Sequence, residues 1–192
     1  MRKLVLASTS RYRRELLERL ELPFETDKPD TDETPLAGEA PAETAIRLAE
    51  TKARAVAVRH PDALIIGSDQ VASIGDERFG KPGTVERAIS QLRQMSGKAI
   101  IFHTAVCLLD TRTGHVSTLC TPTEVGFRTL SDKEIERYVA REMPLDCAGS
   151  AKSEALGITL LDHIRGDDPN ALVGLPMIAL CRLLREAGIQ TI

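Results

Sequence analysis

The chain of 192 residues is poor in aromatic side chains, with no tryptophan, two tyrosines and four phenylalanines. Proteins that bind single-stranded nucleic acid stack successive bases on many aromatic rings, so that class is disfavoured. Positive charge is not in excess either, because 25 Lys and Arg stand against 28 Asp and Glu, for a net charge of −3. We therefore expect no polymeric nucleic acid as a partner. A local basic pocket for a small phosphorylated ligand remains compatible with this charge.

Long apolar runs are also absent. No uncharged stretch reaches the roughly 18 residues that a membrane-spanning helix needs, and the apolar run at residues 4–7 is too short for a signal peptide. We expect no membrane partner. The four cysteines lie far apart and form no C-x-x-C pair, which disfavours a zinc site and a disulfide scaffold. Reduced cysteines are typical of the cytoplasm, and we expect a cytoplasmic location.

Hydrophobic residues make up 42% of the chain, enough for the core of one globular unit spanning residues 1–192. Apolar runs and alternation predict strands at residues 4–7, 23–26, 63–68, 98–110 and 115–127, a hairpin at 71–80, and a short strand at 158–161. Apolar residues at helical spacing, together with capping residues, predict helices from residue 11 to about 20 and over 41–59, 84–95, 131–141 and 176–187. This order, in which βα units alternate with hairpins, predicts an α/β fold with a mixed sheet.

The segment from Ser8 to Arg14 is the first candidate site. A strand ends there and a helix begins beside several arginines. The free N–H groups of a helix N-terminus bind anions. The alternative interpretation is a serine-capped helix with a solvated basic face.

Asp69 is the second candidate, because it follows the buried run at residues 63–68 and is expected at the end of that strand. Ligands bind at the carboxyl ends of strands in α/β sheets. A carboxylate there serves as a general base or a metal ligand, or else as a turn residue.

Residues 75–81 match the first part of a P-loop, G-x-x-x-x-G-K, but Pro82 follows where a P-loop needs Ser or Thr. The sequence therefore argues against a P-loop, while Lys81 remains a candidate for neutralising phosphate. The acidic loop with Asp30, Asp32 and Glu33 either binds Mg²⁺ or is simply solvated. Lys52, on an apolar helix face, either extends to solvent or meets a buried anion.

Several short motifs run in order through the chain: Leu6-Ala7-Ser8-Thr9-Ser10, Asp32-Glu33-Thr34-Pro35, Gly67-Ser68-Asp69-Gln70-Val71, Gly80-Lys81-Pro82, Cys147-Ala148-Gly149-Ser150, Lys152-Ser153-Glu154 and Gly174-Leu175-Pro176. With them the chain resembles the Maf family of nucleotide pyrophosphatases over nearly its whole length. The resemblance implies a Maf/ITPase-like α/β fold, an elongated mixed β-sheet flanked by helices, with two lobes and a central groove. It also implies a homodimer and a divalent cation, Mg²⁺ or Mn²⁺.

The same resemblance implies roles for individual residues. Asp69 would be the catalytic base, Ser8, Arg13, Lys52 and Lys81 would bind the phosphates, and Glu33 would join Asp69 in the metal shell. Among the branches of the Maf family, the YceF-type branch is the one that the chain resembles most. That branch hydrolyses 7-methyl-GTP to the monophosphate and pyrophosphate.

Tyr12, Gln70 and Glu154 stand at the specificity positions of this branch. Tyr12 replaces a tryptophan there, and Arg11 replaces a proline. An aromatic face attracts the cationic methylated base, and a carboxylate at Glu154 accepts from the guanine edge. The alternatives are preference for dTTP, UTP or another noncanonical nucleotide, and a nucleotide-binding regulator of cell division without turnover.

Overall fold

The structure, a computed structural model, describes residues 2–192. Its strands are β1 (Lys3–Ala7), β2 (Phe24–Asp27), β3 (Ala63–Ile74), β4 (Glu77–Phe79), β5 (Ala99–Asp110), β6 (Val116–Phe127) and β7 (Leu161–Gly166). Its α-helices are α1 (Arg11–Glu18), α2 (Pro41–Ala57), α3 (Val85–Met95), α4 (Asp132–Glu142) and α5 (Met177–Glu186). Short 3₁₀ turns lie at Ala148–Ser150, Leu156–Leu160 and Ala171–Val173. No helix of residues 2–192 combines the length and apolarity of a membrane span.

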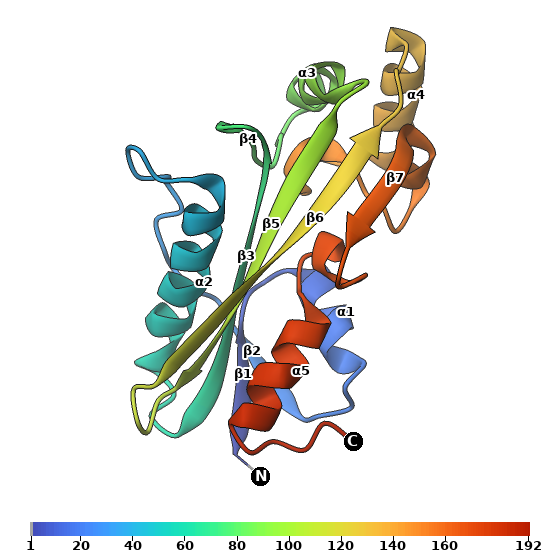
Figure 1. Cartoon of the computed structure of the whole chain (residues 1–192). Helices are drawn as coiled ribbons and strands as arrows, with labels where there is room; N and C mark the ends of the chain where they lie inside the picture. The colour runs from blue at the N-terminus through green and yellow to red at the C-terminus, as the bar shows by residue number, and fades with distance from the viewer. Residues whose placement is uncertain (1) are drawn as a thin grey trace.

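One elongated mixed sheet runs through the molecule (Figure 1), in the strand order β2-β1-β3-β5-β6-β7, with β4 paired to β3. Strand β1 is parallel to β2 and β3, while the long strands β3, β5 and β6 are antiparallel. The α/β class and the mixed sheet predicted from the sequence are confirmed.

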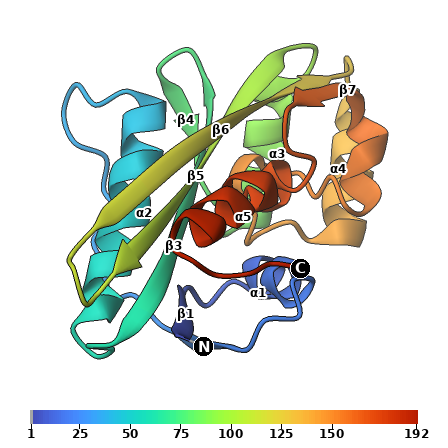
Figure 2. The same ribbon diagram turned by 60° about the horizontal axis from the view of Figure 1, so that its bottom comes forward.

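Helices cover both faces of the sheet at one end. Helix α2 lies on one face and α1 and α5 on the other, as Figure 2 shows. The strands match this arrangement, because Leu4 and Leu6 point into the core with α5, while Val5 and Ala7 point into the core with α2. Burial on both faces explains why β1 is a continuous apolar run.

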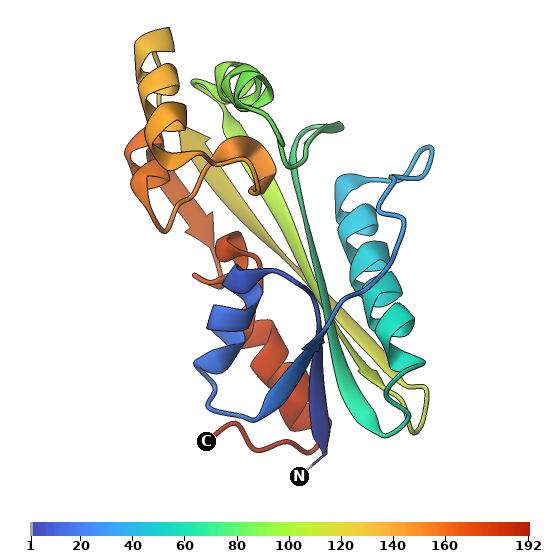
Figure 3. The ribbon, with the colours of Figure 1, turned by 180° about the vertical axis from the view of Figure 1, so that it is seen from behind.

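A separate apolar core lies at the other end of the sheet. Helices α3 and α4 pack there around Leu92, Ile100, Phe102 and Ile135, and Figure 3 shows both at the end away from the termini. The molecule therefore has a basal lobe with α1, α2 and α5 and a distal lobe with α3 and α4. The predicted two lobes are confirmed.

Two local predictions are wrong. The strand predicted to end at Asp69 continues to Ile74, because β5 pairs with β3 from Leu64 to Ser73. The polar run Ser-Asp-Gln interrupts the apolar pattern without ending the strand. The strand predicted at residues 158–161 is mostly a 3₁₀ turn, and the strand itself, β7, begins at Leu161. The turn of the predicted hairpin, between Ile74 and Glu77, is confirmed.

Candidate active site

The pocket that gathers the predicted site residues lies between the two lobes and has a volume of about 940 Å³. It opens at a gap along one edge of β3. Strand β1 pairs with β3 only as far as Ile66, and β4 begins to pair at Ala72. Among the described residues, the intervening part of β3 has a neighbouring strand on one side alone, which is β5. The site thus lies beyond the carboxyl end of β1, where α/β sheets bind ligands.

Asp69, in the middle of this gap, is paired with Lys52 of α2. The Lys52 Nζ lies 2.5 Å from Asp69 Oδ1 and 2.8 Å from Glu33 Oε1. Lys52 and Asp69 are only 5% and 6% exposed. The buried-anion interpretation of Lys52 is therefore confirmed. The contact also brings two carboxylates to one ammonium group.

Close packing of α2 on β3 explains why Lys52 and Asp69 meet. Gly67 faces α2, and a Cβ there would lie 2.1 Å from the carbonyl oxygen of Ala49. Ala49 and Lys52 share a helix face, being three residues apart, and Gly67 and Asp69 share a strand face, being two apart. Gly67 therefore allows α2 to approach β3 closely enough for Lys52 and Asp69 to make contact.

Opposite charges around this pair shift the pKa values of nearby groups. Partial desolvation opposes ionisation of Glu33, but the hydrogen bond and charge of Lys52, with the charges of Lys81 and Arg13, hold the pKa of Glu33 below its ordinary value. Burial lowers the pKa of Arg13, and the charges of Asp69 and Glu33 partly offset this effect. Glu33 is therefore ionised at neutral pH and available to a cation.

The start of α1 forms one wall of the pocket. Ser10 caps the helix by accepting from the Arg13 N–H, and the Ser10 N–H donates to Ser8 Oγ at 3.1 Å. The Arg13 Nε donates to the carbonyl oxygen of Gly174 at 2.8 Å. This bond holds the guanidinium of Arg13 at the pocket wall.

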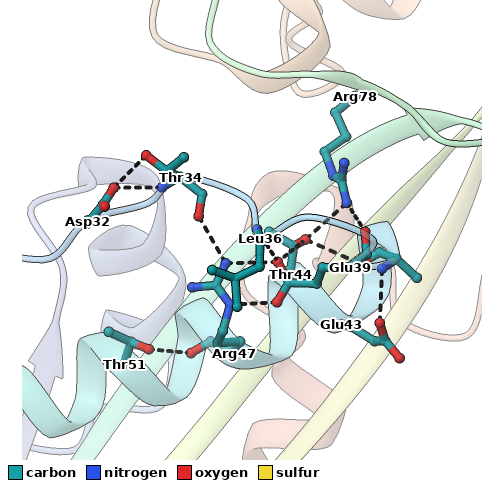
Figure 4. Close-up of polar contacts among 10 residues, drawn as sticks. Asp32, Thr34, Leu36, Glu39, Glu43, Thr44, Arg47, Thr51 and Arg78 are labelled. Atoms are coloured by element: carbon teal, nitrogen blue, oxygen red, sulfur yellow. Dashed lines mark hydrogen bonds and ion pairs between the residues drawn. The ribbon is translucent and has the colours of Figure 1, made fainter.

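A polar network holds the loop of residues 28–40 against α2 (Figure 4). The Arg47 guanidinium lies 2.5 Å from Glu39 Oε1 and 2.9 Å from Glu39 Oε2, and it donates to the Thr34 carbonyl oxygen. Asp32 accepts from the backbone and hydroxyl of Thr34, so it stabilises a turn. Glu33 lies inside this braced segment, and its place beside Lys52 depends on the loop.

The pocket lining also includes residues expected to contact a base. Tyr12 and the exposed Glu154 both line it. The Arg11 guanidinium carbon lies 4.7 Å from the centre of the Tyr12 ring, and its Nη2 donates to the Tyr12 hydroxyl at 2.9 Å. The Tyr12 hydroxyl lies 3.4 Å from Asp146 Oδ2. A cation of the protein therefore already covers one face of this ring.

Gln70 uses its amide nitrogen within the protein. Its Nε2 lies 2.9 Å from Thr104 Oγ1 and 3.0 and 3.1 Å from the carbonyl oxygens of Leu172 and Ala171. These bonds orient the amide, and the described residues leave its Oε1 without a donor. Gln70 lines the pocket, and its amide oxygen can accept a further hydrogen bond.

Comparison with known proteins agrees with the resemblance. The family profile described as "Maf-like protein" matches residues 3–187. The chain belongs to this family.

Two relatives in particular align over nearly the whole of this Maf-like chain. A protein of Aromatoleum aromaticum named "7-methyl-GTP pyrophosphatase" is 68% identical, covering 97% of this chain and 96% of the relative. A protein of the same name from Thiobacillus denitrificans is 57% identical, covering 98% and 94%. Among solved structures, the Staphylococcus aureus Ham1 protein matches with a TM-score of 0.48 and 14% identity, covering 66% of this chain and 72% of that one. The family assignment rests on the family profile and the sequence relatives, and not on the likeness to the Ham1 structure.

Every residue that the resemblance assigns to catalysis, substrate binding or the metal shell lines this one pocket, whereas Arg14 and Asp32 of the candidate segments do not. The set is Ser8, Tyr12, Arg13, Glu33, Lys52, Asp69, Gln70, Lys81 and Glu154. The roles assigned to them stay predictions, since their placement alone does not test them.

Pocket residues that sequence reasoning overlooked include the charged Arg78 and Asp146. Arg78 belongs to the segment that resembles a P-loop, but no pattern distinguishes it from a surface arginine. Asp146 directly precedes the Cys-Ala-Gly-Ser motif, and that neighbour is the one signal that could have drawn attention to it.

Proposed function

We propose that this chain hydrolyses 7-methyl-GTP to 7-methyl-GMP and pyrophosphate. Relatives up to 68% identical over 97% of the chain have the name of this activity. The observation that carries the proposal is the buried pair of Lys52 and Asp69, which sits in a pocket that also contains Arg13 and Lys81. A polyanion matches these cations, and a carboxylate beside them can accept a proton.

The chemistry proposed for Asp69 is that of a general base. Lys52 binds Asp69 Oδ1, and the described residues leave Oδ2 without a partner, so Oδ2 is the atom assigned to the water. The water oxygen attacks the α-phosphorus, its proton passes to Asp69, and the bond from the α-phosphorus to the bridging oxygen breaks. Pyrophosphate leaves with that electron pair. Such transfers depend mainly on positioning and charge neutralisation.

Four residues are assigned to the triphosphate. Ser8 offers a hydroxyl, and Arg13, Lys52 and Lys81 offer positive charge from α1, α2 and the loop after β4. Because they come from separate elements, they can surround the phosphates and hold the α-phosphorus near Asp69.

Three residues are assigned to the base. Tyr12 supplies an aromatic face for the cationic ring, Glu154 a carboxylate for the adjacent N–H groups of guanine, and Gln70 one amide oxygen. Selection for a cationic purine follows from this combination.

A divalent cation, Mg²⁺ or Mn²⁺, is part of the proposal. Residues 2–192 contain no cluster of three or more His, Cys, Asp or Glu suited to a metal ion. Glu33 and Asp69 nevertheless share one ammonium partner, and Mg²⁺ is commonly bound by one or two carboxylates together with substrate phosphates. The donor set therefore fits an ion that arrives with the nucleotide. When bound, it would neutralise phosphate charge.

A homodimer and a cytoplasmic location stay predictions of the sequence. In the cell the proposed reaction would remove modified nucleotides.

The test is pyrophosphate release from 7-methyl-GTP, GTP, dTTP, UTP and dITP, each with Mg²⁺ or Mn²⁺. Selective release from 7-methyl-GTP is expected. Preference for a pyrimidine triphosphate would still support pyrophosphate release as the reaction, but it would contradict the residues assigned to the base. Nucleotide binding without release would favour a regulator.

A further inference from the structure

Arg78 of β4 is a half-buried cation with no counter-ion. Its Nη2 donates to two neutral acceptors, the Glu39 carbonyl oxygen and, at 3.3 Å, Thr44 Oγ1 (Figure 4). Its Nε is buried without an acceptor among the described residues. No carboxylate of residues 2–192 comes within 4.0 Å of its guanidinium. The charge of Arg78 is therefore uncompensated inside the folded chain.

The neighbouring Arg47 shows what a compensated guanidinium looks like here. Arg47 binds both carboxylate oxygens of Glu39, whereas Arg78 binds only the backbone oxygen of the same residue. Burying a charge is unfavourable unless an opposite charge meets it. Because Arg78 lacks a carboxylate partner while the neighbouring Arg47 has one, we look for the counter-ion of Arg78 in an anion that binds from outside the chain.

Arg78 also lies where an anion is expected. It lines the pocket and precedes Lys81 by three residues. Its contact Thr44 lies on α2 eight residues before Lys52, which is about two turns, so both occupy the same helix face. Helical side chains lean toward the N-terminus, so Lys52 extends toward Thr44. A chain of linked phosphates can meet Lys52 and Arg78 together.

We propose that Arg78 binds the polyphosphate of the substrate on the side away from Asp69, at the β- and γ-phosphates that leave as pyrophosphate. This inference rests on the proposed function for the identity of the nucleotide. The guanidinium would neutralise charge that develops on the leaving group, and its fork would bind two phosphate oxygens.

The test measures binding without turnover. Calorimetry with inorganic tripolyphosphate, pyrophosphate and 7-methyl-GMP is compared for the wild-type chain, Arg78→Gln, Arg78→Lys and the control Arg93→Gln. Arg93 is an exposed arginine of α3 paired with Asp132 outside the pocket. We expect Arg78→Gln to weaken tripolyphosphate binding about tenfold, since hydrogen bonds to charged groups are among the strong ones. Arg78→Lys should keep part of that affinity, and 7-methyl-GMP binding should not change.

Three results would overturn the inference: no binding of tripolyphosphate by the wild-type chain, unchanged binding by Arg78→Gln, or an equal loss for 7-methyl-GMP. Melting temperatures separate binding from structure. If Arg78→Lys melts like the wild type yet binds tripolyphosphate no better than Arg78→Gln, the charge is not the cause and the inference fails.

Failure of the proposed function has a different signature. Absence of pyrophosphate release by the wild-type chain, with tripolyphosphate binding that still depends on Arg78, would reject the reaction and support the anion site.

Discussion

Asp69 and Lys52 form a pair in which each group depends on the other. Both are buried, and a buried charge that loses its partner is destabilising. Lys52 has a second partner in Glu33, which is largely exposed, so removing the charge of Asp69 leaves the ammonium with the weaker contact. The pair thus links the proposed chemistry to the stability of the site.

Replacement Asp69→Asn should lower kcat at least about a hundredfold, because a positioned base contributes 10²–10⁴-fold. Steady-state pyrophosphate release measures this, and circular dichroism should show an intact fold with a lower melting temperature. Asp162→Asn, at an exposed position of β7, is the matched control. A variant that keeps more than about a tenth of the wild-type kcat would exclude Asp69 as the base.

Arg11 supplies a positive charge over the Tyr12 ring, where a cationic base would meet it. Replacement Arg11→Gln should therefore raise the preference for 7-methyl-GTP over GTP about two- to fivefold, the effect of a cation–π contact at an exposed site. The ratio of the two kcat/KM values measures it. Arg14→Gln on the same helix, where Arg14 pairs with Glu18 outside the pocket, is the control. A ratio that stays constant or falls would show that Arg11 does not oppose the base.

At the scale of elements, the ion pair of Arg47 and Glu39 is the charged contact in the network that holds the loop of residues 28–40. The hydrogen bonds from Arg47 lower the pKa of Glu39 from 4.5 to about 2, against burial and with help from the Leu36 N–H and the Thr44 hydroxyl. A carboxyl whose pKa is lower in the folded state stabilises the fold above its unfolded pKa. This contribution is lost as the pH falls from 4.5 toward about 2.

Replacement Arg47→Met should make the fold less stable at neutral pH and remove this pH dependence. The difference in melting temperature between wild type and variant should shrink as the pH falls below 4.5. Thermal melts across that interval measure it, with Arg14→Met as the control for loss of an exposed ion pair. If the difference in melting temperature stays constant with pH, the ionisation of Glu39 does not contribute to the stability of the loop.

At the scale of the whole molecule, the pocket joins two lobes with separate apolar cores. The basal core contains α5 and β1, and the distal core contains α3 and α4, but β3 and β5 pass through both. A ligand between the lobes therefore contacts both, and continuous strands connect their unfolding.

An α,β-methylene analogue of 7-methyl-GTP, which resists hydrolysis, should raise the melting temperature of the whole chain in one transition. At about 100 times its Kd it would stabilise the fold by about 2.7 kcal/mol, which is about 5–10 °C for a chain of this size. Differential scanning calorimetry measures the shift. Two transitions, of which one moves, would show that residues 1–192 do not unfold as a single unit.

Most elements were predictable because their signals are local. The apolar stripe of α3, the capping box of Ser131 and Glu134, and the apolar runs of β1 and β3 lie in short stretches of chain. The family motifs also singled out residues that line one pocket, although no local pattern shows that they meet.

The amino-acid sequence by itself determined the α/β class, the order of elements and the family, because periodicity, capping and short motifs are properties of neighbouring residues. Only the tertiary structure decided that Asp69 lies in mid-strand, that Lys52 binds it across 17 residues of sequence, and that Arg78 lacks a counter-ion. Each depends on contacts between distant segments: the ladder with β5, the approach of α2 to Gly67, and the loop that ends at Glu39. Such contacts follow from strand register and packing distance, which no single segment specifies.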